Sequence, residues 1–379
     1  MSWKIGSIEA SGPVVLGPMS GYTSRSYRDF MKPFGVAVSV TEMTSAVGIN
    51  NSDMKTSDYV MFDSNYPTGL QLFGHSAEDI SRAAVKSLEY NQNIDFFDIN
   101  MGCPVHKILR SGAGSVLMKD PELCGDIVRS VKDSTGLPVT AKIRLGSDRN
   151  HMNYIDVISH LESAGADAIT VHARTKDQGY SGSPDYEEIK GLQDRMSVPL
   201  IVSGNIFSLD DAVGAMEATG AAGVMVARGG VGNPFLVTQI DEYFRTGKRL
   251  ENPTVHQQIE WCIELAEMLI GEKGEDCAVR KLRSIAPKFV SGCHRCREYR
   301  LRLATETDDL DSLVSILDEI DRRMGLERIN MDGRRTYYNL ERSPPKSKNR
   351  PAIPEFDVLP VKEAQDRPED RGYQHPLVG

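Results

Sequence analysis

Long apolar runs are missing from this sequence of 379 residues, and none approaches the roughly 18–20 apolar residues that cross a bilayer. The opening residues, MSWKIGSIEASG, also lack the apolar core of a signal peptide. Cysteine is scarce, and six cysteines are too few for a disulfide scaffold, so we expect reduced thiols. Together these absences predict a cytoplasmic protein that has no membrane partner.

Basic residues are outnumbered by acidic ones, and the net charge of −9 taken alone argues against a nucleic-acid partner. The basic residues are nevertheless concentrated between residues 280 and 302, where eight of them accompany a single acid, Glu298. A basic face of this kind suits phosphate contacts, and a merely solvated helix surface is the open alternative. The eight are Arg280, Lys281, Arg283, Lys288, Arg295, Arg297, Arg300 and Arg302.

Strand and helix patterns alternate from residue 13 to about residue 245, which indicates a parallel sheet. Serines at 76 and 208 are typical N-caps for two of the helices. Eight strands in this length predict a (β/α)₈ TIM barrel, of about 250 residues. An open doubly wound sheet is the alternative, but no Gly-x-Gly-x-x-Gly follows the first strand. The predicted strands are Val14–Met19, Val36–Glu42, Gly69–Phe73, Phe96–Asn100, Val139–Arg144, Ala168–Arg174, Leu200–Ser203 and Gly223–Arg228, and the predicted helices are Ala77–Asn91, Pro121–Ser134, Tyr154–Ala164, Ser208–Thr219 and Pro234–Arg245.

After about residue 250 the pattern is helical only, with amphipathic spacing in Gln257–Gly271 and Leu310–Met324. From Ser343 onward, seven prolines fall in 37 residues, which predicts an extended or disordered tail. We therefore predict an α/β protein with a catalytic barrel at 1–245, a smaller all-helical domain at 246–330 and a Pro-rich tail at 331–379.

Function in such a barrel is expected on the loops that follow the carboxyl ends of the strands. Period-two spacing places Lys142 and Arg144 on one strand face, and likewise His172 and Arg174. Glycine-rich turns follow both of the last two strands, where barrels commonly bind phosphate through backbone N–H groups. The residues thus predict a barrel enzyme that holds a phosphorylated ligand, with Lys142 and His172 beside it.

Cys103 is the most conspicuous candidate for chemistry. It follows the predicted strand that ends at Asn100, between Gly102 and Pro104, which break regular structure. A thiol in this position, with Asn100 and Lys107 nearby, can serve as an acid, a base or a nucleophile. A buried free cysteine that acts as a small hydrophobe is the alternative.

A metal site in the helical domain is the other cysteine-based hypothesis. Cys293 and Cys296 have the Cys-x-x-Cys spacing, and Cys262 and Cys277 precede them. A second closely spaced pair is absent, so four ligands would have to come from scattered positions. We expect unpaired thiols and no metal.

The most distinctive block of this sequence is Asp98-Ile-Asn-Met-Gly-Cys-Pro, followed by Lys107 and a Gly-Ser turn. Chiefly through this block, the residues resemble the tRNA-dihydrouridine synthases from Leu16 to about Arg245 and, more loosely, to about residue 325. Other flavin-binding barrels share the fold but not the Asn-x-Gly-Cys-Pro block. Supporting blocks are Pro18-Met19-Ser20-Gly21-Tyr22-Thr23, Glu42-Met43, Gln71-Leu72-Phe73-Gly74, Lys142-Ile143-Arg144 and His172-Ala173-Arg174-Thr175.

The resemblance implies reduction of the C5–C6 double bond of specific tRNA uridines, by FMN that NADPH or NADH reduces. Hydride would reach C6, and Cys103 resembles the family's proton donor to C5. Because an unperturbed thiol has a pKa near 8.5, it is protonated at neutral pH. The resemblance implies flavin contacts by Pro18, Met19, Ser20, Gln71, Lys142, His172, Ser203, Gly204, Asn205, Ala227 and Arg228, and substrate contacts by Asn100, Lys107 and Arg174.

At the phosphate loops this chain departs from bacterial relatives, which usually have Asn-Gly-Asp and Gly-Arg where it has Ser203-Gly204-Asn205 and Ala227-Arg228. The target uridine must leave the tRNA stack to reach a barrel mouth. We expect tRNA as the partner of a monomeric enzyme, gripped by the basic segment. An FMN barrel that acts on a small pyrimidine and a non-catalytic tRNA-binding barrel are the competing hypotheses.

Overall fold

The computed structural model describes residues 2–330 apart from 54–55, 57–58, 64–65 and 295. The described residues belong to one compact unit. The predicted tail at 331–379 and Arg295 of the basic segment lie outside the described residues. Within the part that is described, no helix combines the length and the apolar character needed to cross a membrane.

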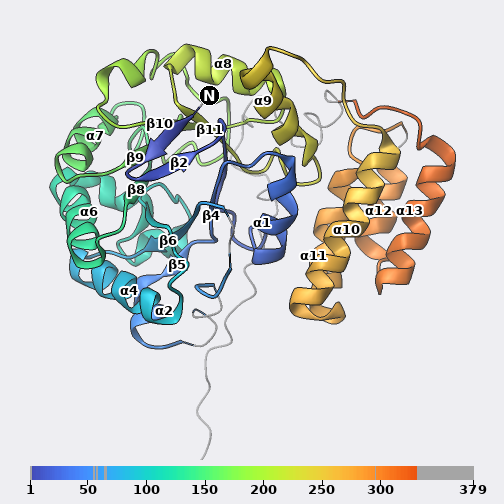
Figure 1. The fold of residues 1–379 in the computed structure, drawn as a ribbon, viewed down its shortest axis with the longest axis horizontal. Helices are drawn as coiled ribbons and strands as arrows, with labels where there is room; N and C mark the ends of the chain where they lie inside the picture. Colours follow the sequence, from blue (N-terminus) through green and yellow to red (C-terminus); the bar gives the residue numbers. More distant parts are fainter. Residues whose placement is uncertain (1, 54–55, 57–58, 64–65, 295, 331–379) are drawn as a thin grey trace, which may run out of the picture. The chain divides into compact units, whose positions relative to one another are not determined.

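A closed barrel of eight parallel strands forms the larger part of the fold (Figure 1). The strand order runs β4-β3-β11-β10-β9-β8-β7-β6, and β4 also pairs with β6, which closes the ring. The predicted TIM barrel is therefore confirmed, and the open doubly wound sheet is excluded. The strands are β3 (Val14–Leu16), β4 (Val38–Val40), β6 (Thr68–Phe73), β7 (Phe96–Asn100), β8 (Val139–Arg144), β9 (Ala168–His172), β10 (Leu200–Ser203) and β11 (Gly223–Val226), and β5 (Thr44–Ser45) adds a short pair on β6.

The five predicted outer helices are all present. Their serine caps are confirmed, because Ser76 accepts from the Asp79 N–H and Ser208 from the Asp211 N–H. The helices are α4 (Ala77–Tyr90), α6 (Pro121–Thr135), α7 (Tyr154–Ser163), α8 (Leu209–Thr219) and α9 (Phe235–Thr246). Shorter helices that the sequence did not predict are α1 (Arg25–Met31), α2 (Ala46–Asn50) and α5 (His106–Arg110), together with the 3₁₀ turns η1 (Lys32–Phe34), η2 (Gly114–Lys119) and η3 (Leu192–Arg195).

An N-terminal hairpin and the inward side chains of the strands make a second core inside the barrel. The hairpin, β1 (Trp3–Ile5) with β2 (Ile8–Ala10), was not predicted. Its Trp3 Nε1–H donates to the Gly12 carbonyl at 3.0 Å. The hairpin and the inward residues bury one apolar cluster: Trp3, Ile5, Ala10, Val15, Ala37, Val38, Val40, Phe96, Ala168, Ile201 and Met225.

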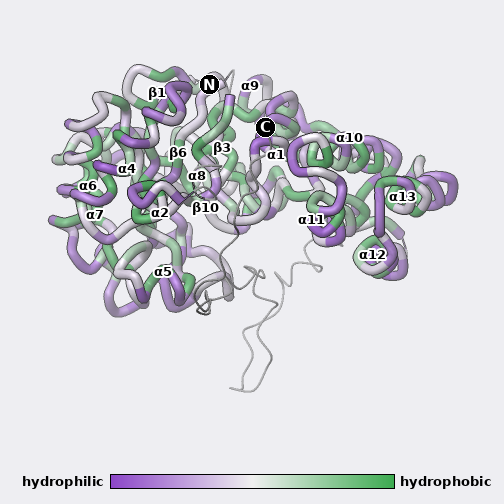
Figure 2. Tube along the Cα trace, turned by 90° about the horizontal axis from the view of Figure 1, so that it is seen from below, coloured by the Kyte–Doolittle hydropathy of each residue, from purple (hydrophilic) through white to green (hydrophobic). Residues whose placement is uncertain are grey.

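The helical domain follows the barrel and packs against it through α1, α9 and the turn between α1 and β4. The Trp261 ring stacks on Phe235 at 5.8 Å and meets Phe34 edge-on at 5.2 Å between centroids. Glu272 accepts from the Ser26 N–H at 2.9 Å. Hydrophobic and hydrophilic residues alternate along these helices (Figure 2), as expected of amphipathic packing. The helices are α10 (Val255–Lys273), α11 (Glu275–Phe289), α12 (Cys296–Thr305) and α13 (Leu310–Met324).

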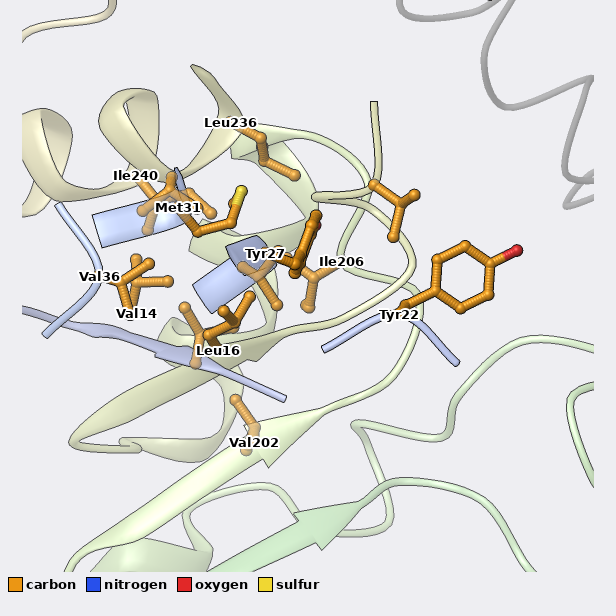
Figure 3. Packing of buried hydrophobic residues seen from close by; sticks show 14 of the residues in the cluster. Val14, Leu16, Tyr22, Tyr27, Met31, Val36, Val202, Ile206, Leu236 and Ile240 are labelled. Atoms are coloured by element: carbon orange, nitrogen blue, oxygen red, sulfur yellow. The ribbon is translucent and has the colours of Figure 1, made fainter. Parts of the chain in front are cut away.

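The core between barrel and helices reaches the loop that follows β3. Figure 3 shows Met31 of α1 beside Leu236 and Ile240 of α9, and Leu16 of β3 belongs to the same buried cluster. Tyr22, at the edge of the same cluster, directs its hydroxyl away from it. The apolar packing thus fixes the base of a loop whose predicted role is cofactor binding.

A substitution at Gly69 on β6 tests the packing of the apolar cluster inside the barrel. A Cβ at Gly69 would lie 2.2 Å from Cε2 and 2.4 Å from Cζ of the Phe96 ring, which is buried in the inner cluster. Because that ring must shift, we expect Gly69→Ala to lower the free energy of unfolding by about 1–3 kcal/mol. Urea unfolding followed by circular dichroism measures the loss.

Gly214→Ala is the matched control. Gly214 is exposed within α8, and an added Cβ meets no described heavy atom within 4 Å. Alanine there should raise the free energy of unfolding by roughly 0.5–1 kcal/mol. An unchanged urea midpoint for Gly69→Ala would contradict the described contact with Phe96.

Candidate active site

Cys103 lies half-buried on the loop after β7, and the loop is held from both sides. Its N–H donates to Asn100 Oδ1 at 2.9 Å, and its carbonyl accepts from the Ser115 N–H at 3.1 Å. Gly114, at φ +66°, leaves room for this approach, since a Cβ there would lie 2.7 Å from the Cys103 carbonyl oxygen. The Gly-Ser turn of the motif therefore packs directly against the cysteine.

Burial raises the pKa of Cys103, against the opposing effects of a backbone hydrogen bond and of the Arg144 and Lys142 charges. The thiol is consequently protonated at neutral pH. Such a group can donate a proton, and it is a poor nucleophile without a base beside it. The raised pKa of the thiol is compatible with the acid among the roles that the sequence left open.

Lys142 stands on the inward face of β8 and is the register partner of Asn100 on β7. Burial, with a smaller contribution from Arg144, lowers the pKa of Lys142 to about 8. Among the described residues, its ammonium has no recorded hydrogen bond or ion pair. A cation placed this way, close to Cys103, is suited to an anionic or electron-rich ligand.

His172 is a neutral histidine at the end of β9, with 7% of its surface exposed. Arg174 Nη1 lies 3.1 Å from His172 Nε2, and because a guanidinium only donates, Nε2 must accept and carry no proton. Burial and the charges of Arg144, Lys142, Arg174 and Arg228 hold the pKa of His172 well below its ordinary value. The ring therefore offers Nδ1–H as its donor.

Arg174 lies inside the fold, and the substrate contact predicted for it stays a prediction. The residue is fully buried, and its guanidinium donates to the carbonyls of Ser181 at 3.3 Å and Gly182 at 2.6 Å as well as to His172. Each of its three nitrogens is engaged with protein atoms instead of pointing toward solvent. Arg174 holds the loop after β9 in place.

Tyr180, which the sequence did not predict as a site residue, lies on that same loop and is 50% exposed. The Arg228 guanidinium carbon lies 4.8 Å from the Tyr180 ring centroid, and that of Arg144 lies 5.6 Å away. Arg144 also donates to the Gly179 carbonyl at 2.9 Å. An aromatic residue between glycines after a barrel strand, in Gln178-Gly-Tyr-Ser-Gly182, was the signal that could have revealed it.

The two predicted phosphate loops, after β10 and β11, meet each other. Arg228 Nη2 donates to Asn205 Oδ1 at 3.3 Å, and Tyr186 donates to the Gly204 carbonyl at 2.5 Å. A Cβ on Gly229 would lie 1.8 Å from the Ile206 carbonyl oxygen, so only glycine fits. Ser203 is the last residue of β10, and Ala227 directly follows the last residue of β11. That the loops hold a phosphate stays a prediction.

The loop after β3, which contains Pro18, Met19 and Ser20, is anchored from two directions. The Gly21 N–H donates to Glu42 Oε1 of the barrel, and Lys288 of α11 donates to the Tyr22 hydroxyl at 3.3 Å. The helical domain therefore contacts the predicted cofactor loop directly.

Gln71 is fully buried on β6 and does not present a free amide edge. Its Nε2 donates to Asp98 Oδ2 at 2.6 Å, and its Oε1 accepts from Asn100 Nδ2 at 2.9 Å. Asn100 is 7% exposed, and its Oδ1 accepts a hydrogen bond from the Cys103 N–H. The flavin contact predicted for Gln71 and the base contact predicted for Asn100 stay predictions.

Six basic residues of the described part of the basic segment fall into three groups. Lys281 and Lys288 turn toward the barrel, while Arg283 pairs with Asp308 at 2.7 Å and Arg302 with Glu319 at 2.8 Å. Within the described residues, the exposed Arg280 and Arg297 have no recorded ion pair, and neither has the exposed Lys107 of α5. The cations open to a polyanion are thus fewer than the sequence suggested.

The described residues contain no group of three or more His, Cys, Asp or Glu that could hold a metal ion. An FMN group, by contrast, suits the residues that are present. The unpartnered Lys142 ammonium and the glycine-lined turns after β10 and β11 are features that a flavin ring and a phosphate would use.

A parallel (β/α)₈ barrel that presents a protonated thiol and a cation at its carboxyl end defines a barrel enzyme. The sequence family model described as dihydrouridine synthase matches residues 15–322, and the chain belongs to that family. It is 34% identical to a probable tRNA-dihydrouridine synthase of Rickettsia conorii, over 78% of this chain and 90% of that one. It is 32% identical to tRNA-dihydrouridine synthase B of Pseudomonas aeruginosa, over 78% of this chain and 89% of that one.

Among solved structures, the 6-hydroxypseudooxynicotine amine oxidase of Pseudomonas geniculata is similar with a TM-score of 0.53 and 12% identity. The similarity covers 85% of this chain and 66% of that one. At this identity it supports the barrel fold alone. The family and the enzyme class predicted from the sequence are confirmed by the family match.

The lowered pKa of Lys142 predicts a pH effect on stability. Between about pH 8 and about pH 10 the unfolded chain keeps a proton on this lysine that the folded chain has released. The amount by which Lys142 lowers the free energy of unfolding therefore shrinks as the pH rises. We expect Lys142→Met to be more stable than the wild type near pH 7, with the difference narrowing through pH 8 to 10. Urea unfolding across that range measures it.

Lys190→Met provides the control, since Lys190 is exposed and pairs only with Glu187 at 3.2 Å. Its difference from the wild type should stay flat over the same range. A constant difference for Lys142→Met as well would show that the lysine titrates as it does in solvent, and would contradict its burial.

Proposed function

We propose that this protein reduces the C5–C6 double bond of uridines in tRNA to give dihydrouridine, with FMN as cofactor and NADPH or NADH as reductant. The observation that carries the proposal is the half-buried, protonated Cys103 thiol near the Lys142 cation, which has no recorded hydrogen bond among the described residues, in a chain of the dihydrouridine synthase family. The tRNA substrate follows the printed names of the relatives.

FMN, when bound, supplies the hydride that reaches C6 of the uracil. Pro18, Met19 and Ser20 and the loops after β10 and β11 would hold it, with Lys142 and His172 beside it. Lys142 favours negative charge on a bound ring. Neutral His172 contributes a hydrogen-bond donor at Nδ1 and adds no further positive charge.

Cys103 delivers the proton to C5. The S–H bond breaks as the C5–H bond forms, and the charge that develops at C5 is conjugated with the C4 carbonyl. The thiolate that remains lies in the field of Arg144 and Lys142, both of which oppose the raised pKa of this thiol. Solvent then returns the proton. The raised pKa keeps the Cys103 thiol protonated before each turnover.

Asn100 and Tyr180 take positioning roles. The Asn100 amide is engaged with Gln71 and with the Cys103 N–H, so we assign it to orienting the thiol and not to bonding the base. Tyr180 offers an exposed ring at the barrel mouth, against which an extruded base can stack.

Exposed cations outside the mouth would meet the tRNA backbone. Arg280 and Arg297 of the helical domain and Lys107 of α5 are the described residues that suit this role. We expect Arg280→Glu/Arg297→Glu to weaken tRNA binding and to lower the salt slope of log affinity by about two, since each phosphate contact contributes about one. Filter binding between low and moderate salt measures both.

Arg82→Glu/Arg129→Glu is the matched control, because it makes the same charge change on the outer barrel helices α4 and α6. Its salt slope should match that of the wild type. Equal slopes for both double variants would show that the basic segment makes no phosphate contacts.

The proposal is tested by mapping dihydrouridine in tRNA from a strain that lacks the gene. The wild-type gene should restore specific dihydrouridines, while Cys103→Ala should restore fewer than about one in a hundred, the effect typical of removing a general acid. The purified Cys103→Ala protein should still hold its flavin. Unchanged dihydrouridine in the deletion strain would favour a small pyrimidine substrate instead.

A further inference from the structure

We propose that Asp98 is a positioning residue: with Thr140, it sets the direction of a buried hydrogen-bond chain that runs through Gln71 and Asn100 to the backbone of Cys103. The link to catalysis depends on the proposed function. The chain itself can be tested in protein that carries neither FMN nor tRNA.

The chain begins in a single layer of the barrel interior. Gln71, Asp98 and Thr140 are register partners on the neighbouring strands β6, β7 and β8. Thr140 Oγ1 donates to Asp98 Oδ1 and Gln71 Nε2 donates to Asp98 Oδ2, each at 2.6 Å. All three side chains are at most 3% exposed, so water does not compete for these bonds.

The chain continues one layer higher, toward the barrel mouth. Asn100 Nδ2 donates to Gln71 Oε1 at 2.9 Å. Asn100 Oδ1 in turn accepts from the N–H of Cys103 at 2.9 Å and of Gly102 at 3.3 Å. The carboxylate inside the barrel is therefore joined to the candidate acid by three consecutive side-chain links.

Only one direction satisfies every link. The backbone N–H groups of Gly102 and Cys103 must donate, so Asn100 faces them with its oxygen and faces Gln71 with its nitrogen. Gln71 then meets Asn100 with its oxygen and Asp98 with its nitrogen. An ionised carboxylate can only accept, so Asp98 is the end that this order requires, and it keeps both amides from turning over.

The field around Asp98 is compatible with this role. Burial raises the pKa of Asp98, while the hydrogen bonds from Gln71 and Thr140 and the nearby Lys142 charge act in the opposite direction. Reversal of an amide would leave donors facing donors in a buried layer, at a cost of about 1–3 kcal/mol for each unpaired group. The chain is thus a stiff connection, and it holds the Cys103 loop without touching the reacting atoms.

The direction of the hydrogen bonds can be tested by moving the carboxylate from position 98 to another position in the chain of hydrogen bonds. Gln71→Glu should break the chain, because two carboxylates would face each other. Adding Asp98→Asn should restore it: the amide introduced at position 98 can donate to the carboxylate introduced at position 71 and accept from Thr140, while that carboxylate accepts from Asn100. Asn100→Asp should fail in the same way and be restored by the same Asp98→Asn, with the Gln71 amide reversed.

The readout is hydrogen exchange of the Cys103 amide in protein without FMN, followed by mass spectrometry, with the rate of Cys103 alkylation in the same peptide. We expect about fivefold to tenfold faster exchange in each single variant, which corresponds to the loss of one hydrogen bond. Each double variant should return within about twofold of the wild type. Asn100→Ala serves as the reference for complete loss of the bond.

Each outcome of this experiment either supports or contradicts the directional chain of hydrogen bonds. Recovery in the double variants supports the directional chain, and so does recovery of folding if the single variants fail to fold. Wild-type protection in both single variants, or double variants that exchange or unfold like their parents, would overturn it. Dihydrouridine formation plays no part in this result, so failure of the proposed function is seen separately.

Discussion

The hydrogen bond between Gln71 and Asp98 lies between the apolar cluster inside the barrel and the polar residues of the candidate active site. Two residues below Asp98 on β7, Phe96 lies in the apolar inner cluster, and two residues above it Asn100 reaches the Cys103 loop. Gln71 and Thr140 both donate to this buried carboxylate, and the nearby Lys142 charge also favours its ionised form. The positions of Asn100 and Cys103 depend on that layer.

Above this layer, toward the mouth of the barrel, several positively charged side chains lie close together. Arg144, Arg174 and Arg228 direct their hydrogen bonds to carbonyls and side chains of the surrounding loops. Burial, together with these charges, holds the pKa of His172 well below its ordinary value, and the charge of Arg144 also opposes the raised pKa of Cys103. Lys142 alone among the described cations here has no recorded bond, which leaves it available to a bound group. The three arginines thus supply both structural hydrogen bonds and positive charge.

Much of this arrangement could be predicted from the sequence, because strand runs, capping serines and period-two spacing are local signals. The hairpin β1–β2, whose strands have three residues each, was missed. The burial of Arg174 was not foreseen, because spacing places a side chain on a face but does not say which carbonyls it meets. Tyr180, and the division of the basic segment between ion pairs and exposed cations, depend on loop and tertiary contacts that no local pattern encodes.

The most direct test of the account uses purified holoenzyme whose flavin has been reduced without oxygen and then mixed with unmodified tRNA. The account predicts that the visible band of oxidised flavin returns on mixing, in step with the dihydrouridine formed, and stays absent when the tRNA already carries the modification. A protein purified without a flavin band, or a reduced flavin that unmodified tRNA leaves unchanged, would contradict it.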